Sequence, residues 1–325
     1  MKTCLILALD GSPLSSVSGP LEILALANQY LQTEQKFQIR VVSESDRTIA
    51  GAMGLNLTSH SQLRHEQETA CLILVAAIGH PSARQAPINP EVLGWLNSQY
   101  QQGAEIATIC TGAFVLAETG LLDGHIATTH WSCESLFRQR FPDINLHCEK
   151  MITEDRGLMC AGGASAFQDM SLYLIKRYLG EAIAQRCART LLIDLDRHSQ
   201  LRYRSFKPGF QHKDTLIHKL QDWLAEHYAS ECSLPVLAAQ INLSERQMVR
   251  RFKAATGEAP LAYIQSLRVE QAKNRLLASK KSIEKISLEC GYQDVRFFRE
   301  LFKRHTDLSP SEYRNKFMML DHAAS

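Results

Sequence analysis

The sequence predicts two domains of different fold class: an α/β domain with a mostly parallel sheet, followed by an all-α domain with two helix-turn-helix motifs. Three observations support this prediction. The first part of the chain alternates apolar runs with helical patterns, the second part contains one helical pattern twice, and the two parts differ in charge. At 325 residues the chain has room for about two domains. We place them at residues 1–195 and 213–320, joined by a linker over residues 196–212.

The first domain is predicted from alternating strand and helix patterns. We expect strands at residues 4–9, 37–43, 71–77 and 105–109, and helices at 19–32, 90–101, 112–120, 131–140 and 165–179. The run Cys71-Leu72-Ile73-Leu74-Val75 is apolar throughout, which is typical of a strand covered on both faces. Strands that alternate with helices in this way form α/β domains around a mostly parallel sheet.

The two parts of the chain differ in charge. Up to Asp194 the chain has 14 Lys and Arg against 19 Asp and Glu, and from residue 195 onward it has 22 against 15. The net charges are therefore −5 and +7. A basic second part is what a nucleic-acid-binding domain requires. Between the two, the stretch from Arg197 to Phe210 has no periodicity and is the natural linker.

Composition favours a cytoplasmic protein. The chain has nine cysteines, an odd number without a C-x-x-C pair, which indicates reduced thiols. The apolar run that begins at Cys4 stops at Asp10 after six residues, so a buried first strand is a better interpretation than a signal peptide. No stretch approaches the ~18 apolar residues of a membrane span. We expect no membrane contact, no metal and no cofactor.

The second domain is predicted from an internal repeat. The motif F-K-x-x-T-x-x-x-P-x-x-Y occurs twice, 50 positions apart, at Phe252, Lys253, Thr256, Pro260 and Tyr263 and again at Phe302, Lys303, Thr306, Pro310 and Tyr313. A fixed period predicts two copies of one supersecondary unit. Each copy has the pattern of a short apolar helix, a turn at Asn242 or Gly291, an N-cap at Ser244 or Asp294, and a basic helix. This order is typical of a helix-turn-helix that places its second helix in a DNA groove.

The outward residues of the two basic helices are candidate DNA contacts. Met248 and Phe252 in the first helix, and Phe298 and Phe302 in the second, are spaced for burial on one face. The residues turned towards solvent are then Glu245, Arg246, Gln247, Arg250 and Lys253 in the first helix, and Val295, Arg296, Arg299, Glu300 and Lys303 in the second. Arg can bind guanine bidentately, and Arg and Lys neutralise phosphates. The alternative is that these charges form only a solvated helix face.

Residues 259–278 form one helical pattern between the two copies, with Leu261, Ile264, Leu267, Ala272 and Leu276 on a common face. About 20 residues at ~1.5 Å each make a rod of roughly 30 Å. This length is close to the ~34 Å between successive major-groove faces of B-DNA. The spacing predicts that the two recognition helices enter adjacent turns of one groove.

Residues 213–317 resemble the DNA-binding domain of AraC-family transcription regulators. The resemblance is strongest in Cys290-Gly291-Tyr292, in Phe298 to Arg304 and in Ser309 to Arg314, and two departures are Asn242 for the usual Gly and Ser287 for the usual Ala. The resemblance implies double-stranded DNA as partner. By position it implies base contacts from Arg246, Val249, Arg250, Val295, Arg296, Arg299 and Glu300, with Lys253 and Lys303 better suited to phosphates.

One place in the first domain has residues that could carry chemistry. The strand Glu105–Ile109 leads into Cys110-Thr111-Gly112 through a sharp turn, with the Cys at its apex. Such a turn exposes a nucleophile in α/β enzymes, and the following helix N-terminus can lower the thiol pKa and bind anions. His130 ends another short strand, where its imidazole could meet the thiol. Candidate neighbours at the same edge of the sheet are Thr111, Gly79, His80 and Gly163.

The segment from Ile109 to Trp131, followed by Ala161-Gly162-Gly163-Ala164, resembles the PfpI-like branch of the class I glutamine amidotransferase-like superfamily. The implied fold is flavodoxin-like, and its combination with AraC-like repeats resembles the GlxA-like group of regulators. Enzymatic relatives usually carry an acid in the first loop, whereas here no carboxylate follows Leu14 until Glu22, and Ile78-Gly79 replaces a Gly-Gly pair. Cys110 is alternatively a relic at a strained turn, and His130 a hydrogen-bonded histidine.

Three functions follow from these patterns. The favoured one is a DNA-binding regulator whose α/β domain senses a small molecule. The second is an enzyme, an isonitrile hydratase-like or other PfpI-like hydrolase that carries DNA-binding repeats. The third is an interaction module in which the α/β domain only dimerises. Relatives of the α/β domain are commonly dimers, so the resemblance also implies a homodimer.

Overall fold

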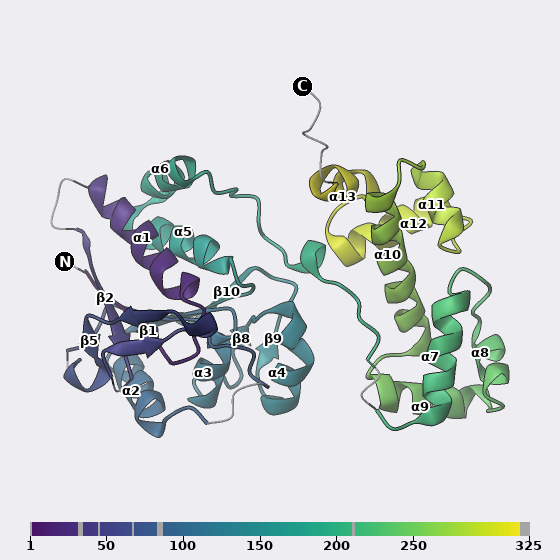
Figure 1. The fold of residues 1–325 in the computed structure, drawn as a ribbon, viewed down its shortest axis with the longest axis horizontal. Coiled ribbons are helices and arrows are strands. Elements are labelled where there is room, and N and C mark those ends of the chain that lie inside the picture. Colours follow the sequence, from purple (N-terminus) through teal and green to yellow (C-terminus); the bar gives the residue numbers. More distant parts are fainter. Residues whose placement is uncertain are drawn as a thin grey trace. The chain divides into compact units, whose positions relative to one another are not determined.

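The chain folds into two compact units, residues 1–200 and 201–325, each with its own hydrophobic cores (Figure 1). The structure is a computed structural model, and it describes residues 2–31, 35–44, 46–66, 68–82, 87–209 and 212–318. The first unit is α/β and the second is all-α, as the sequence predicts.

The first unit is built on a seven-stranded sheet in the order β10-β11-β7-β6-β1-β2-β5. Neighbouring strands run parallel except β10, which pairs antiparallel with β11. The strands are β1 (Lys2–Ala8), β2 (Phe37–Ser43), β5 (Ser61–Gln62), β6 (Leu72–Val75), β7 (Glu105–Ile109), β10 (Ile152–Asp155) and β11 (Leu158–Ala161). The predicted mostly parallel sheet is confirmed, and all four residues of β6 are buried because helices cover both faces.

Helices cover the two faces of the sheet in two sets of three. One face is packed by α1 (Ser15–Gln29), α5 (Ala166–Leu179) and α6 (Glu181–Leu191), and the other by α2 (Pro90–Gln101), α3 (Gly112–Glu118) and α4 (Glu134–Arg140). Two small strand pairs complete the unit, β3 (Thr48–Ala50) with β4 (Asn56–Thr58) and β8 (Ile126–Ala127) with β9 (Asn145–Leu146).

Most elements expected in the first unit are present with shifted ends. The helix expected at 131–140 is divided, because the His130 side chain accepts a hydrogen bond from Ser132 N and starts a 3-10 helix, η3 (Trp131–Cys133), before α4 begins. The helix expected at 19–32 is α1, which ends at Gln29, and Gln32 lies outside the described residues. The short strand expected to end at His130 is β8, which ends at Ala127. Helix α6 and the short strands β3, β4, β5, β9, β10 and β11 were not predicted.

The second unit contains two helix-turn-helix motifs, α8–α9 and α11–α12, with α10 running between them (Figure 1). Its helices are α7 (Thr215–His227), α8 (Leu234–Gln240), α9 (Glu245–Thr256), α10 (Pro260–Ala278), α11 (Ile283–Glu289), α12 (Val295–Thr306) and α13 (Pro310–Phe317). The repeated motif produces repeated geometry. The Tyr263 ring meets Phe252 edge-on at 5.1 Å between centroids, and Tyr313 meets Phe302 at 5.4 Å.

The two turns need a left-handed backbone. Asn242 has φ 51° and Gly291 has φ 83°, a region that glycine and asparagine tolerate best. The helix α10 also forms as expected, but one residue of its predicted apolar face is wrong. Leu261 is 48% exposed, whereas Tyr263 and Val269 are buried. The reason is that α10 packs on two separate cores, one at each end, and Leu261 lies in neither.

The segment expected to be a linker over residues 196–212 is largely packed. Gln200 is buried in the first unit, and residues 201–209 lie on the second, where Arg202 pairs with Asp307 at 3.3 Å and Phe206 meets Tyr263 edge-on at 5.0 Å. The units divide at one peptide bond, between Gln200 and Leu201. Phe210 and Gln211 lie outside the described residues.

Candidate nucleic-acid interface and ligand pocket

Helix α9 presents the first candidate DNA face. Its start is fixed by a capping box in which Gln247 N donates to Ser244 Oγ and Ser244 N donates to Gln247 Oε1. Met248 and Phe252 are fully buried, as the spacing predicts. The side chains of Arg246, Arg250 and Lys253 are exposed, whereas Val249 is half-buried against the core.

Helix α12 presents the second candidate face. Asp294 accepts hydrogen bonds from Arg296 N and Phe297 N and so caps the helix. Phe298, Leu301 and Phe302 are buried. Of the predicted contacts, Arg296, Arg299 and Lys303 are exposed and Val295 is half-buried.

The two faces differ in their ion pairs. On α12, Arg296 pairs with Glu300 at 3.3 Å and Arg299 pairs with Glu284 at 2.8 Å. Arg246 and Arg250 on α9 have no ion pair with any residue that the structure describes. Contact with an anion would therefore require Arg296 and Arg299 to leave a carboxylate, whereas Arg246 and Arg250 have none to leave in the described structure.

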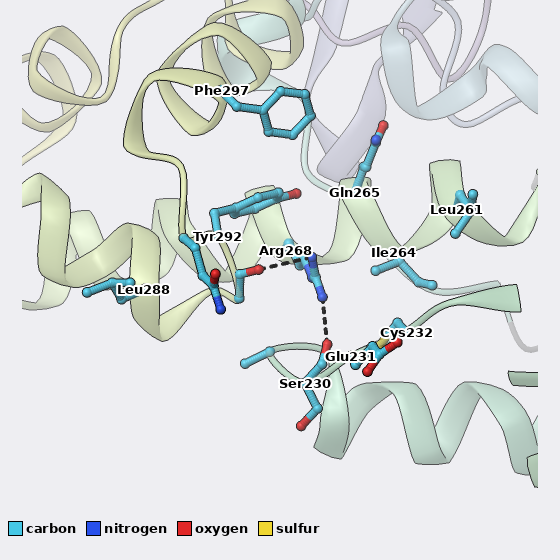
Figure 2. Close-up of a pocket in the computed structure, with 13 residues that line it drawn as sticks. Ser230, Glu231, Cys232, Leu261, Ile264, Gln265, Arg268, Leu288, Tyr292 and Phe297 are labelled. Carbon is cyan, nitrogen blue, oxygen red and sulfur yellow. Dashed lines mark hydrogen bonds between the residues drawn. The ribbon is translucent and has the colours of Figure 1, made fainter. Parts of the chain in front are cut away.

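Sequence reasoning overlooked Phe297 on α12. Its ring is 44% exposed and lies 6.0 Å from the Tyr292 ring, at the edge of a recess between the two motifs (Figure 2). The helical spacing could have identified it, because Phe298 four residues before Phe302 takes the core position and leaves Phe297 outward.

In the first unit, the strand-to-helix turn has the predicted form. Cys110 has φ 54°, a left-handed conformation that is rare for a side chain other than Gly, Asn or Asp. Cys110 N donates to Ala161 O at 2.7 Å, and Thr129 Oγ1 donates to Cys110 O at 2.9 Å. Position 112 requires glycine, because a Cβ there would lie 2.7 Å from Val75 O. The surrounding sheet thus holds the strained turn in place.

A cavity of about 230 Å³ lies against this turn. The lining residues are Pro13, Ala77, Ile78, Gly79, His80, Cys110, Thr111, His130, Ser132, Cys133 and Ala164. Five predicted site residues are therefore brought together. Gly163 does not line the cavity, but its backbone N–H faces the Cys110 sulfur. Ser132 and Cys133 were not predicted, since η3 places them there and nothing in their spacing indicates it.

Burial favours the uncharged forms of three groups in the cavity, Cys110, Cys133 and His130. It raises the pKa of the Cys110 thiol to about 11, against the opposing effect of the Thr111 and Gly163 N–H groups. Burial likewise raises the pKa of Cys133 and, with the charge of His80, lowers the pKa of His130. The expectation that the helix N-terminus activates the thiol is wrong, because desolvation is the larger effect.

Cys110 and His130 share the cavity without a hydrogen bond between them in the described structure. His130 Nδ1 lies 2.7 Å from Ser132 Oγ and accepts from Ser132 N at 3.1 Å, and its ring packs on Trp131. His80 Nε2 lies 4.0 Å from the sulfur of Cys133. The arrangement therefore lacks the thiol–imidazole pair of an activated nucleophile.

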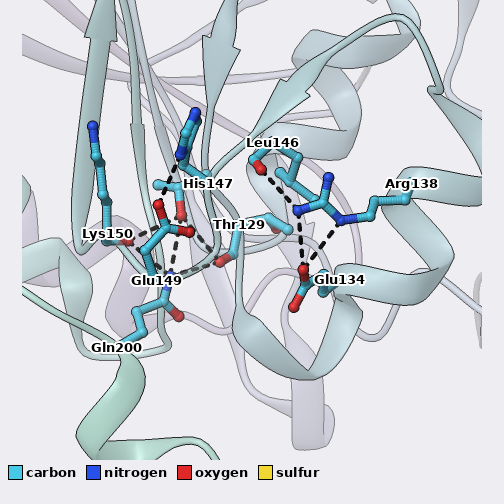
Figure 3. Close-up of polar contacts among 9 residues, drawn as sticks. Thr129, Glu134, Arg138, Leu146, His147, Glu149, Lys150 and Gln200 are labelled. Carbon is cyan, nitrogen blue, oxygen red and sulfur yellow. Dashed lines mark hydrogen bonds and ion pairs between the residues drawn. The ribbon is translucent and has the colours of Figure 1, made fainter. Parts of the chain in front are cut away.

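A buried glutamine holds the loop that carries His130. Gln200 Nε2 donates to Thr129 O at 2.9 Å and to Lys150 O at 3.0 Å (Figure 3). Nε2 also lies 3.1 Å from Thr128 Oγ1, and Oε1 accepts from Trp131 N. This network ties the end of the first unit to the candidate pocket. Sequence reasoning assigned Gln200 to the linker, because the pattern gives no sign of contacts so distant along the chain.

Two further searches concern only the described ranges of the chain. They contain no group of three or more His, Cys, Asp or Glu side chains placed to hold a metal ion. They also contain no helix that is both long and apolar enough to cross a membrane.

Comparison with known proteins agrees with this two-unit organisation. A family model described as the DJ-1/PfpI family matches residues 1–177, more than half of the chain. The chain belongs to the DJ-1/PfpI family. A second model, described as a helix-turn-helix domain, matches residues 237–316. The DJ-1/PfpI match covers the Cys110 turn, and the helix-turn-helix match covers both recognition helices.

Two curated relatives align with both units. The transcriptional regulator GbdR of Pseudomonas aeruginosa is 27% identical over 311 residues, which is 95% of this chain and 83% of that protein. The regulator CdhR of the same organism is 24% identical over 311 residues, or 95% of this chain and 90% of that protein. The predictions of an AraC-type regulator with a PfpI-like first domain, and of DNA-binding regulatory function, are confirmed.

Solved structures support the fold. An AraC family transcriptional regulator from Pseudomonas putida matches with a TM-score of 0.51 at 21% identity, over 59% of this chain and 100% of that one. Drosophila melanogaster DJ-1beta matches with a TM-score of 0.52 at 17% identity, over 59% of this chain and 98% of that one. At these identities the likeness concerns the fold alone.

Proposed function

We propose that this regulator binds a small metabolite in the Cys110 pocket, and that binding changes the affinity of its helix-turn-helix motifs for double-stranded DNA. The observation that supports this most is the composition of the pocket. Its lining side chains include a neutral thiol and a neutral imidazole but no Asp, Glu, Lys or Arg in the described structure. Such a cavity is suited to binding a small polar molecule. Among its described lining residues, only the imidazoles of His80 and His130 are ordinary proton carriers.

The ligand we propose carries an anionic or amide group. The N–H groups of Thr111 and Gly163 face the Cys110 sulfur and can donate to a carboxylate or carbonyl oxygen placed beside it. At about 230 Å³ the cavity is smaller than the ~300–1,000 Å³ of pockets that hold drug-sized molecules. Parallel sheets of this class bind ligands at the carboxyl ends of their strands, where Cys110 lies.

On the DNA side we propose base contacts from the exposed arginines and phosphate contacts from the lysines. Arg246 and Arg250 on α9 and Arg296 and Arg299 on α12 are exposed, which supports this proposal, and Val249 and Val295 are half-buried on the same helices. Lys253 and Lys303 each follow a buried phenylalanine near the end of the helix. This position suits a contact with a DNA phosphate.

We also propose that the protein acts as a homodimer in the cytoplasm. Its nine cysteines are all free thiols, a state that a reducing compartment maintains. Dimerisation would link two DNA-binding units and raise their affinity for a paired site through effective concentration. Sedimentation of the full chain tests this proposal, because a homodimer should have twice the mass of one chain.

The sensing proposal is tested by ligand-dependent DNA binding. An operator is selected from random DNA with the full chain, and small carboxylates and amides are screened for a change in its Kd. A ligand that acts through the pocket should shift Kd by about 5- to 150-fold, the usual range of allosteric coupling. Cys110→Ala should alter this response while leaving ligand-free DNA binding intact.

The second candidate is a PfpI-like hydrolase or isonitrile hydratase-like enzyme that carries DNA-binding repeats. The strained Cys110 turn and the two N–H donors at its sulfur favour it. Multiple turnover of an amide, isonitrile or aldehyde, lost in Cys110→Ala, would establish the enzyme and overturn the sensing proposal.

A further inference from the structure

The two helix-turn-helix motifs meet at a recess of about 780 Å³ beside the middle of α10. One wall is the turn between α7 and α8 (residues 228–233), and the opposite wall is the turn between α11 and α12 (residues 290–294) (Figure 2). The first wall leads through helix α8 to recognition helix α9, and the second wall leads directly into recognition helix α12. The geometry of this recess therefore bears on the separation of the two recognition helices.

Arg268 of α10 bridges the two walls. Its Nε donates to Tyr228 O at 2.6 Å and its Nη2 donates to Ser230 O at 2.8 Å, both in the α7–α8 turn. Its Nη1 donates to Gly291 O at 3.3 Å in the α11–α12 turn, and its guanidinium lies 5.1 Å from the Tyr292 ring centre (Figure 2). One planar group thus binds three carbonyls, two in the turn that precedes the first motif and one in the turn of the second motif. A lysine cannot do this, because it has no such planar fork.

The two walls also touch directly at Gly291. A Cβ at this position would lie 2.6 Å from Ala229 O and 3.0 Å from its Cα. These atoms are backbone, so any side chain at 291 would push the two turns apart. The glycine therefore serves the contact between motifs in addition to the left-handed turn.

We propose that Arg268 is a positioning residue that fixes the distance and rotation between α9 and α12, and thereby the spacing of the two DNA subsites that one chain accepts. One inserted base pair moves a subsite by ~3.4 Å along the DNA and turns it by roughly 35° about the axis. A packed interface does not deform continuously over such a distance. An intact Arg268 bridge should therefore restrict the protein to one spacing of the two DNA subsites. Loss of the bridge should allow other spacings.

The test uses the full chain and three versions of one operator. The DNA subsites of α9 and α12 are first located by base-pair substitutions. A base pair belongs to the α9 subsite if its substitution raises the Kd of the wild type but not that of Arg250→Ala, and to the α12 subsite if the same holds for Arg299→Ala. Kd is then measured with the selected spacing and with one base pair inserted or deleted between the subsites. The spacing penalty is the ratio of two Kd values, so it does not depend on the fraction of protein that is folded.

Arg268→Lys and Gly291→Ala disturb the bridge from its two sides. The matched control is Arg314→Lys. Arg314 of α13 also donates to two carbonyls, Leu276 O at 3.2 Å and Lys281 O, but these contacts do not join the α7–α8 turn to the α11–α12 turn. In the wild type and in Arg314→Lys we expect a penalty of about tenfold or more per inserted base pair, the loss of one good base contact. In both bridge variants we expect the penalty to fall below about threefold, with weaker binding at the selected spacing.

Two outcomes would overturn the proposal. One is an unchanged spacing penalty in Arg268→Lys and Gly291→Ala, which would mean that α10 alone sets the separation. The other is an equal relaxation in Arg314→Lys, which would reduce the effect to general loosening of the unit. Neither outcome depends on the pocket of the first unit, so the result stands apart from the sensing proposal.

Discussion

The pocket of the first unit and the recognition helices of the second place ionisable side chains in opposite surroundings, buried in the pocket and exposed on the helices. In the pocket, burial raises the pKa of Cys110 and lowers that of His130, so both stay uncharged near neutral pH. On α9 and α12 the side chains of Arg246, Arg250, Arg296 and Arg299 are exposed to solvent. The exposed basic side chains thus lie on the two helices proposed to contact DNA, whereas burial favours the uncharged forms of Cys110 and His130 in the pocket.

Loss of a recognition arginine should have the largest effect. Arg250→Ala should cost about 1–3 kcal/mol at its own base pair and relax the preference there, because a bidentate base contact is lost. Arg299→Ala should cost less, since the wild-type side chain must first leave Glu284. Titrations with single-base variants of the operator measure both. Unchanged affinity and preference in Arg246, Arg250, Arg296 and Arg299 variants would remove these helices from the interface.

The pocket turn can be broken without touching the DNA face. In Gly112→Ala the new methyl would meet two backbone oxygens, Val75 O at 2.7 Å and Ala76 O at 2.8 Å, which should destabilise the first unit by about 1–3 kcal/mol. In a Trp223→Phe background, Trp95 and Trp131 report denaturant unfolding of that unit. Gly94→Ala is the control, because nothing lies within 4 Å of its added Cβ. Equal stability of the two variants would mean that the turn is loosely held.

The recognition helices could be predicted because their information is local. The repeated Thr256 and Thr306 each hydrogen-bond the carbonyl four residues earlier, and each basic helix begins with its own cap, so neighbouring residues specify each motif. The parallel sheet could likewise be predicted, because central strands such as β6 are apolar throughout. The β10–β11 hairpin was missed although Arg156 and Gly157 both have positive φ, a two-residue turn whose signal was present in the sequence.

The pocket could be predicted only in part, because its chemistry depends on distant contacts. The turn at Cys110 could be predicted, because in the sequence a strand pattern is followed by small residues and then by a helix pattern. The sign of the Cys110 pKa shift does not, since it depends on how much of the chain covers the sulfur. The roles of Cys133 and Gln200 depend on η3 and on contacts about 70 residues apart in the sequence. Untested predictions, such as the base contacts and the dimer, remain predictions.

Salt dependence sharpens the comparison on the DNA side. If Lys253 and Lys303 contact phosphates, each change to Ala should weaken binding to all sequences alike and reduce the slope of log K against log salt by ~0.9. Titrations at several salt concentrations give the slope. A loss confined to one base pair would place that lysine on a base instead.

The smallest expected effect is a gain. Glu284→Gln removes the partner of Arg299, whose ion pair is exposed and screened by solvent, so DNA affinity should rise by at most a few fold. Glu245→Gln on α9 is the control, because Glu245 pairs with no arginine in the described structure. Weaker DNA binding in Glu284→Gln would show that the pair orients Arg299 for its target.

The central claim, that Cys110 belongs to a binding pocket and is not an activated nucleophile, is tested most directly by its alkylation rate. Iodoacetamide reacts with the thiolate, so a pKa of about 11 predicts a rate about a hundredfold below that of an ordinary thiol of pKa 9.0 near neutral pH. Mass spectrometry of the Cys110 peptide follows the reaction in the full chain between pH 7 and 9.5. We predict a slow rate that rises about tenfold per pH unit and is unchanged in His130→Ala. A fast rate that is flat across this range and falls in His130→Ala would contradict the account.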